Sequence, residues 1–300
     1  MSNHPRNRLE ANGVYLGQLG LGIEHFVRGV SEIKHLTREE HNRNILDEAY
    51  KLGITHYDLV FNFPYFFDTF RDFIANKREK ITFTTHLGIV YNEKNGNNVK
   101  SRSLVNIKKS FESMMDQLDV DCVDIALMQY VRNVEDYEII KKNRIIEYLH
   151  QLKVEGRAKA IGVSGHNPLL LSRTINEGDY DMAMFTLNFA TGFHETTKDL
   201  IKMCKEKEMA VIGIKTLLKG KLFTTKKTDL AAYYSGGRKY SLKLDEAATP
   251  SQCINFALDA GADTVVFGVK TVDELRENVQ SFNSEKGMNN YQELVKLFRI

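Results

Sequence analysis

Short apolar runs alternate along the chain with longer segments in which apolar residues recur every three or four positions. The short runs are rich in β-branched and aromatic residues, which is typical of buried strands, and the longer segments have the spacing of amphipathic helices. The predicted strands are 14–23, 54–61, 81–88, 123–131, 158–164, 181–188, 209–215 and 263–268. The predicted helices are 37–52, 66–76, 103–118, 143–155, 168–177, 196–207, 249–260 and 272–282.

Eight strands that alternate with eight helices predict an α/β fold, a closed (β/α)8 TIM barrel, as a single domain over residues 1–300. Thr37 and Glu40 form a capping box for the first helix, and Gly53 closes it. Residues 288–300 are expected to add a C-terminal helix. A doubly wound open sheet is the rival fold. It is disfavoured because the glycines near residue 20 lack the Gly-x-Gly-x-x-Gly spacing and no helix is predicted directly after them.

Two segments break the alternation of strands and helices. Residues 89–101, rich in Asn, Gly and Lys, are predicted to form a polar loop. Residues 219–244 are an insertion after the seventh strand, and the pair Gly236 and Gly237 suits either a mobile flap or a plain solvated loop. The sequence leaves these two alternatives open.

The charge balance and the cysteine count exclude several functions. The 41 basic and 39 acidic residues give a net charge of +2, so neither a nucleic acid nor an anionic membrane surface is an expected partner. No apolar run approaches the ~18 residues of a membrane span. Cys122, Cys204 and Cys253 are far apart and form no metal or redox motif, so we expect no metal and a cytoplasmic setting. The oligomeric state is not determined by the sequence.

Polar residues stand where the predicted strands end. In a barrel of this kind, catalytic and binding groups lie at the carboxyl ends of the strands. The candidates at those ends are Asp58, His86, Gln129, Ser164 to Asn167, Asn188 and Lys215. One such residue alone would be read as a polar cap on the rim, but six in equivalent places predict a cavity for a small-molecule substrate.

Four segments at these positions, 53–58, 121–129, 156–164 and 267–278, resemble in order and spacing the signature segments of the aldo-keto reductases. The resemblance implies transfer of hydride between NADP(H) and a carbonyl compound, with a tetrad of Asp, Tyr, Lys and His. Asp58 matches the family's Asp, whereas Phe63, His86 and Gln129 stand where Tyr, Lys and His are expected. The chain is most similar to an iron–sulfur branch but lacks the cysteine-rich tail of that branch, so we expect no cluster.

The loss of the tyrosine removes the usual proton donor, because Phe63 has no hydroxyl. His86 is the first candidate to replace it, since the Asp58 carboxylate would orient the imidazole and favour its charged form. Tyr65, two residues beyond Phe63, is the second candidate. Gln129 would position a substrate oxygen by hydrogen bonding.

The cofactor residues are more fully retained. The resemblance assigns Gly268, Lys270, Glu277 and Asn278 to the adenosine and phosphate end and Ser164 to the nicotinamide carboxamide. Asn188 and Lys215, at the ends of their strands, are further cofactor-binding candidates. Glu274 stands where many relatives carry an Arg, and Met184 where they carry a Gln. We therefore expect NADP as the cofactor, with NAD possible. Asn167 is read as a helix cap, and His166 could face either the cavity or solvent.

Two other functions stay open. Asp58 and His86 could serve as the acid/base pair of a non-redox lyase or dehydratase. The barrel could also bind a nucleotide without catalysing a reaction, because a (β/α)8 fold does not determine the chemistry.

Overall fold

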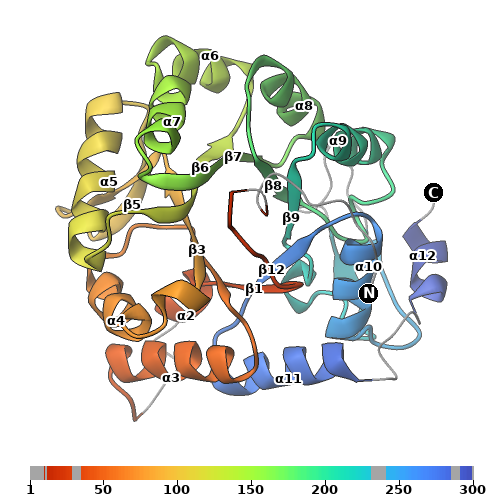
Figure 1. The fold of residues 1–300 in the computed structure, drawn as a ribbon. Coiled ribbons are helices and arrows are strands. Elements are labelled where there is room, and N and C mark those ends of the chain that lie inside the picture. Colours follow the sequence, from red (N-terminus) through yellow and green to blue (C-terminus); the bar gives the residue numbers. More distant parts are fainter. Residues whose placement is uncertain (1–9, 11, 29–34, 231–240, 285–290, 299–300) are drawn as a thin grey trace.

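Eight parallel strands close into a barrel in a computed structural model that describes residues 10, 12–28, 35–230, 241–284 and 291–298. The order around the barrel is β1, β12, β9, β8, β7, β6, β3, β2 (Figure 1). The strands are β1 (Leu19–Gly22), β2 (His56–Leu59), β3 (Thr82–Leu87), β6 (Val123–Val131), β7 (Ala158–Gly165), β8 (Met182–Thr186), β9 (Ala210–Ile214) and β12 (Thr264–Gly268). The predicted (β/α)8 barrel is thus confirmed.

Helices surround the barrel on the outside (Figure 1). The α-helices are α2 (Glu24–Arg28), α3 (Arg38–Lys51), α4 (Pro64–Ile74), α5 (Leu104–Leu118), α6 (Val134–Lys142), α7 (Ile145–Val154), α8 (Pro168–Glu177), α9 (Glu195–Glu206), α10 (Pro250–Asp259), α11 (Val272–Asn283) and α12 (Gln292–Phe298). Short 3-10 helices follow α4, as η2 (Arg78–Lys80), and β9, as η3 (Leu218–Gly220). The capping box of Thr37 and Glu40 is present at the start of α3, and Asn167 caps α8, as predicted.

Apolar side chains fill the barrel interior, so it is a packed core and not a pore. The residues of this interior cluster are Val14, Ile125, Leu127, Ala160, Met182, Met184, Ala210, Ile212 and Val266. The chain before β1 runs across the middle of the barrel (Figure 1), at the end where the strands begin. It is anchored there by Thr82 Oγ1, which donates to Tyr15 O (3.0 Å), and by Asn12 Nδ2, which donates to Asp181 Oδ1 (3.2 Å). The candidate residues lie at the opposite end, where the strands finish.

The prediction of a plain loop over residues 89–101 is wrong. This segment is an antiparallel hairpin of β4 (Ile89–Asn92) and β5 (Asn97–Lys100), and Gly96 in its turn has φ 66°. All four residues of β4 are half-buried, so the segment has no apolar face whose alternation would reveal strands. Helix α6 was also not predicted; its buried Tyr137 and Ile140 provide only a short apolar pattern.

The insertion at 219–244 is described in part. Strands β10 (Thr228–Asp229) and β11 (Ser241–Leu242) pair with each other, whereas the predicted flap residues Gly236 and Gly237 lie outside the described residues. In the part of the chain that the structure describes, no helix is long and apolar enough to cross a membrane.

Candidate active site

Asp58 and His86 form a buried pair at the carboxyl ends of the adjacent strands β2 and β3. His86 Nε2 lies 2.6 Å from Asp58 Oδ1, and both residues are only 4% exposed. A carboxylate can only accept, so Nε2 carries the hydrogen of this bond. His86 Nδ1 is buried and has no partner among the described residues. The imidazole therefore has one nitrogen oriented by a carboxylate and the other without a hydrogen bond.

A second histidine lies two residues before Asp58 on the same face of β2. His56 is fully buried, and its Nε2 lies 2.9 Å from Thr84 Oγ1 on β3. Burial lowers the pKa of His56 to about 4, although the nearby Asp58 and Asp124 act in the opposite direction. His56 is therefore neutral near pH 7 and forms a polar layer beneath the Asp58–His86 pair.

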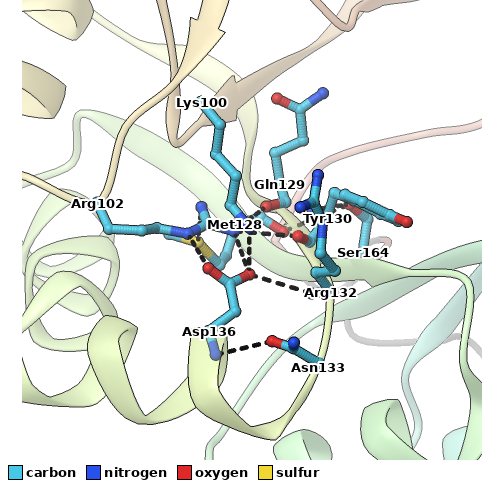
Figure 2. Close-up of polar contacts among 9 residues, drawn as sticks. All are labelled: Lys100, Arg102, Met128, Gln129, Tyr130, Arg132, Asn133, Asp136 and Ser164. Atoms are coloured by element: carbon cyan, nitrogen blue, oxygen red, sulfur yellow. Dashed lines mark hydrogen bonds and ion pairs between the residues drawn. The ribbon is translucent and has the colours of Figure 1, made fainter.

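Gln129 follows on β6, the next strand after β3 around the barrel. Its Nε2 donates to Val60 O (3.2 Å), while its Oε1 is buried and has no partner among the described residues. The backbone carbonyls of Gln129 and Tyr130 both accept hydrogen bonds from Arg102, at 3.0 Å each (Figure 2). Gln129 is thus held by its backbone and presents a buried acceptor oxygen.

The aromatic candidates after β2 lie at the start of α4. Phe63 is the N-cap residue of this helix and is 2% exposed, and Pro64 occupies the first turn. Tyr65 is 37% exposed, and the Arg38 guanidinium lies 4.5 Å over its ring. Burial raises the pKa of Tyr65, whereas Arg38 opposes the shift. The Tyr65 hydroxyl is therefore a weaker acid than an ordinary tyrosine, which counts against it as the proton donor.

Ser164 and Asn188 make hydrogen bonds within the protein. Ser164 Oγ accepts from the Tyr130 N–H (2.9 Å) and donates to Met128 O (3.4 Å). Asn188 is fully buried; its Nδ2 donates to Lys215 O (3.1 Å) and its Oδ1 accepts from the Ala190 N–H (2.9 Å). These side chains hold the strand ends and loops, so any effect of Asn188 on a ligand would act through Lys215.

Lys215 and His166 lie near each other at the same end of the barrel. Lys215 has a left-handed backbone (φ 55°) and is exposed, and desolvation together with Lys219 lowers its pKa. His166 is half-buried, with its ring centroid 4.6 Å from that of Tyr130. Burial, assisted by Lys215, lowers the pKa of His166 to about 4. His166 is therefore a neutral ring packed on Tyr130 near pH 7.

The start of α11 offers groups that fit the phosphates and sugars of a dinucleotide. Gly268 on β12 lies beside Gly22 on β1, and a Cβ at Gly268 would lie 2.5 Å from His25 Nδ1, so a larger residue there would have to displace the His25 side chain. Lys270 and Glu277 are exposed, and Asn278 is 8% exposed. The exposed Lys270 and the helix N-terminus fit an anionic cofactor.

The Glu274 side chain binds a backbone N–H at the start of α11. Its Oε2 accepts from the Lys270 N–H (2.6 Å), and its own N–H donates to Thr271 Oγ1 (3.2 Å). One backbone donor that a phosphate could use is therefore already bound to a carboxylate.

No metal centre accompanies these residues: no group of three His, Cys, Asp or Glu side chains within the described ranges could hold an ion. A small cavity lies between β3 and α5 and is lined in part by His86, Thr85, Ile107 and Phe111.

The closed parallel barrel is the fold of an aldo/keto reductase, and the comparison with family models agrees. The model of the aldo/keto reductase family matches residues 18–297, and the chain belongs to this family. The family uses nicotinamide cofactors and small-molecule substrates.

Individual relatives are distant. The uncharacterized oxidoreductase YqkF of Bacillus subtilis (strain 168) is 22% identical over 299 residues, which cover 94% of this chain and 92% of that protein. An aldo-keto reductase from Bacillus halodurans, solved in its holo form, superposes with a TM-score of 0.73 at 18% identity, covering 95% of this chain and 93% of that one. A glycerol dehydrogenase from Gluconobacter oxydans superposes with a TM-score of 0.65 at 15% identity, covering 94% of this chain and 91% of that one. At these identities the solved structures support the fold alone.

Proposed function

We propose that this protein is an oxidoreductase that transfers hydride between a nicotinamide cofactor and a small carbonyl or alcohol substrate, with His86 as its proton donor. The observation that carries the proposal is the buried contact of 2.6 Å between His86 Nε2 and Asp58 Oδ1, together with the unpartnered His86 Nδ1. Membership of the aldo/keto reductase family supports the reaction class.

The proton step follows from the geometry of the pair. Asp58 orients the imidazole through Nε2, and a hydrogen on Nδ1 can then be donated to the oxygen of a carbonyl as that oxygen gains charge. In the reverse direction, neutral Nδ1 accepts the proton of an alcohol. Phe63, which stands where relatives have a tyrosine, has no proton to give.

The cofactor would supply or accept the hydride. We propose that Lys215, Lys270, Glu277, Asn278 and the edge at Gly268 would hold it, because they combine exposed cations, a helix N-terminus and an accessible strand end. NADP is the expected form and NAD is possible. Glu274 weakens the preference for NADP, since its carboxylate occupies the Lys270 N–H and would repel a 2′-phosphate.

Titration with NADPH and NADH, followed by a carbonyl panel, tests the proposal. We expect binding of at least one cofactor, turnover of a carbonyl, and a loss of about 100-fold or more in kcat for His86→Ala. His150→Ala on α7 is the matched control and should keep its activity. Failure to bind either cofactor would refute the proposal. In that case the Asp58–His86 pair would favour the acid/base chemistry of a lyase or dehydratase.

A further inference from the structure

Arg102 and Asp136 form a buried ion pair behind the end of β6. Arg102 Nε donates to Asp136 Oδ1 and Nη2 donates to Asp136 Oδ2, both at 2.9 Å, and the two side chains are 8% and 9% exposed (Figure 2). Lys100 Nζ lies 2.6 Å from the same Oδ2. Burial alone would raise the pKa of Asp136, but Arg102 and Lys100 outweigh it and hold this pKa well below its ordinary value. The pair therefore stays charged.

The ion pair holds a distorted stretch of backbone. The pairing of β6 with β7 shifts register between Met128 and Val131, and Tyr130 has φ 47°, a left-handed conformation that is unfavourable for a tyrosine. Arg102 Nη2 binds the carbonyls on both sides of this point, those of Gln129 and Tyr130. A planar guanidinium can bind the Asp136 carboxylate and these carbonyls together, which a lysine ammonium cannot do in the same geometry.

Figure 2 shows the Gln129 side chain directed away from this ion pair. Its amide orientation is defined, because Val60 O can only accept and must therefore face Nε2. The remaining oxygen, Oε1, is a buried acceptor without a donor among the described residues. Such an atom is costly unless a ligand or water supplies the missing hydrogen bond.

The position of Gln129 indicates which ligand that is. His86 pairs in register with Leu127 of β6, and Gln129 lies two residues further along the same face. Of the cofactor candidates, Lys215, Gly268 and Lys270 belong to β12 and to the segments after β9 and β12, on the other side of the barrel. Ser164 on β7 lies beside β6 instead, where its hydroxyl is bonded to the backbone. Gln129 therefore lies on the His86 side of the barrel mouth, away from Lys215, Gly268 and Lys270.

We propose that Gln129 selects carbonyl substrates that carry an O–H or N–H donor next to the reacting carbonyl, and that Arg102 positions Gln129 for this contact. The inference rests on the proposed function for the reaction, whereas the recognition itself does not require turnover. An analogue without the donor leaves Oε1 unsatisfied, so kcat/KM should favour the hydroxy substrate by roughly tenfold to 100-fold.

Hydroxyacetone and butan-2-one are the matched probes, since they differ by a hydroxyl in place of a methyl group. For each, kcat/KM is measured with the reduced cofactor, and binding to the enzyme with the oxidised cofactor is measured by ligand-observed NMR. Wild type should prefer hydroxyacetone in both assays, and Gln129→Met should bring the ratio close to one. A wild-type ratio near one, or a ratio that survives in Gln129→Met, overturns the inference.

The positioning role is tested by Arg102→Lys against Arg157→Lys. Arg157 also makes a two-point pair, with Glu112 at 2.6 Å for each bond, but on the surface and before β7. We expect Arg102→Lys to lower the substrate ratio at least threefold, mainly through the KM of hydroxyacetone, and Arg157→Lys to leave it unchanged. Equal ratios in the two variants refute the role of Arg102. Selective binding without turnover of any carbonyl would support the recognition by Gln129 and refute the proposed oxidoreductase function.

Discussion

The buried His56 should make the stability of this barrel depend on pH. Its pKa is lowered from 6.5 to about 4 in the folded protein, chiefly by burial. Below about pH 6.5 the unfolded chain binds a proton that the folded chain excludes, so stability is fully present above that pH and is lost as pH falls toward 4. Because of this difference in proton binding, His56 lowers the free energy of unfolding by about 2 kcal/mol when the pH falls from about 7 to about 5.

The variant His56→Leu isolates this contribution, because leucine does not titrate. It leaves Thr84 Oγ1 without its partner, so the variant has a different absolute stability. The comparison is therefore between the changes in unfolding free energy with pH, not between the absolute stabilities of the two proteins. Urea unfolding of both proteins at about pH 7 and pH 5 gives two free energies of unfolding for each, and wild type should lose about 2 kcal/mol more than His56→Leu. An equal loss in the two proteins would show that His56 is not buried as a neutral imidazole.

Three further predictions concern the site. Because Asp58 and His86 act as one unit, Asp58→Asn, His86→Ala and the double variant should reduce kcat by similar factors; multiplicative losses in the double variant would contradict the pairing. The loss in kcat/KM should be at least ten times smaller for Tyr65→Phe than for His86→Ala, because the Tyr65 hydroxyl has a raised pKa. A larger loss for Tyr65→Phe would make Tyr65 the proton donor. Glu274→Arg should raise the ratio of NADPH to NADH affinity at least tenfold in a fluorescence titration, with Glu274→Gln giving a smaller rise; a constant ratio in both would place the 2′-phosphate elsewhere.

Much of the barrel could be predicted from the sequence because its signals are local. Strand β6 (Val123–Val131) and helix α8 (Pro168–Glu177) have the predicted bounds, since apolar periodicity and the Asn167 cap mark them directly. The closeness of Asp58 and His86 also follows from local information, because neighbouring parallel strands end on the same face of a barrel.

The hairpin at 89–101 was missed for a physical reason. Its residues are half-buried or exposed, so packing against the core imposes no alternation on them. The Asn95–Gly96 pair was the available signal, since this dipeptide favours a hairpin turn.

The sequence by itself determined the order of strands and helices and which polar residues reach the same end of the barrel. Only the tertiary structure decided what those residues do there. Arg102 lies 27 positions from Gln129, and no local pattern shows that its guanidinium binds that carbonyl. In the same way, Asn188 is a polar residue at a strand end, yet its amide holds the backbone of Lys215. Such contacts join segments that are distant in the chain, and they arise only when the barrel closes and removes these groups from water.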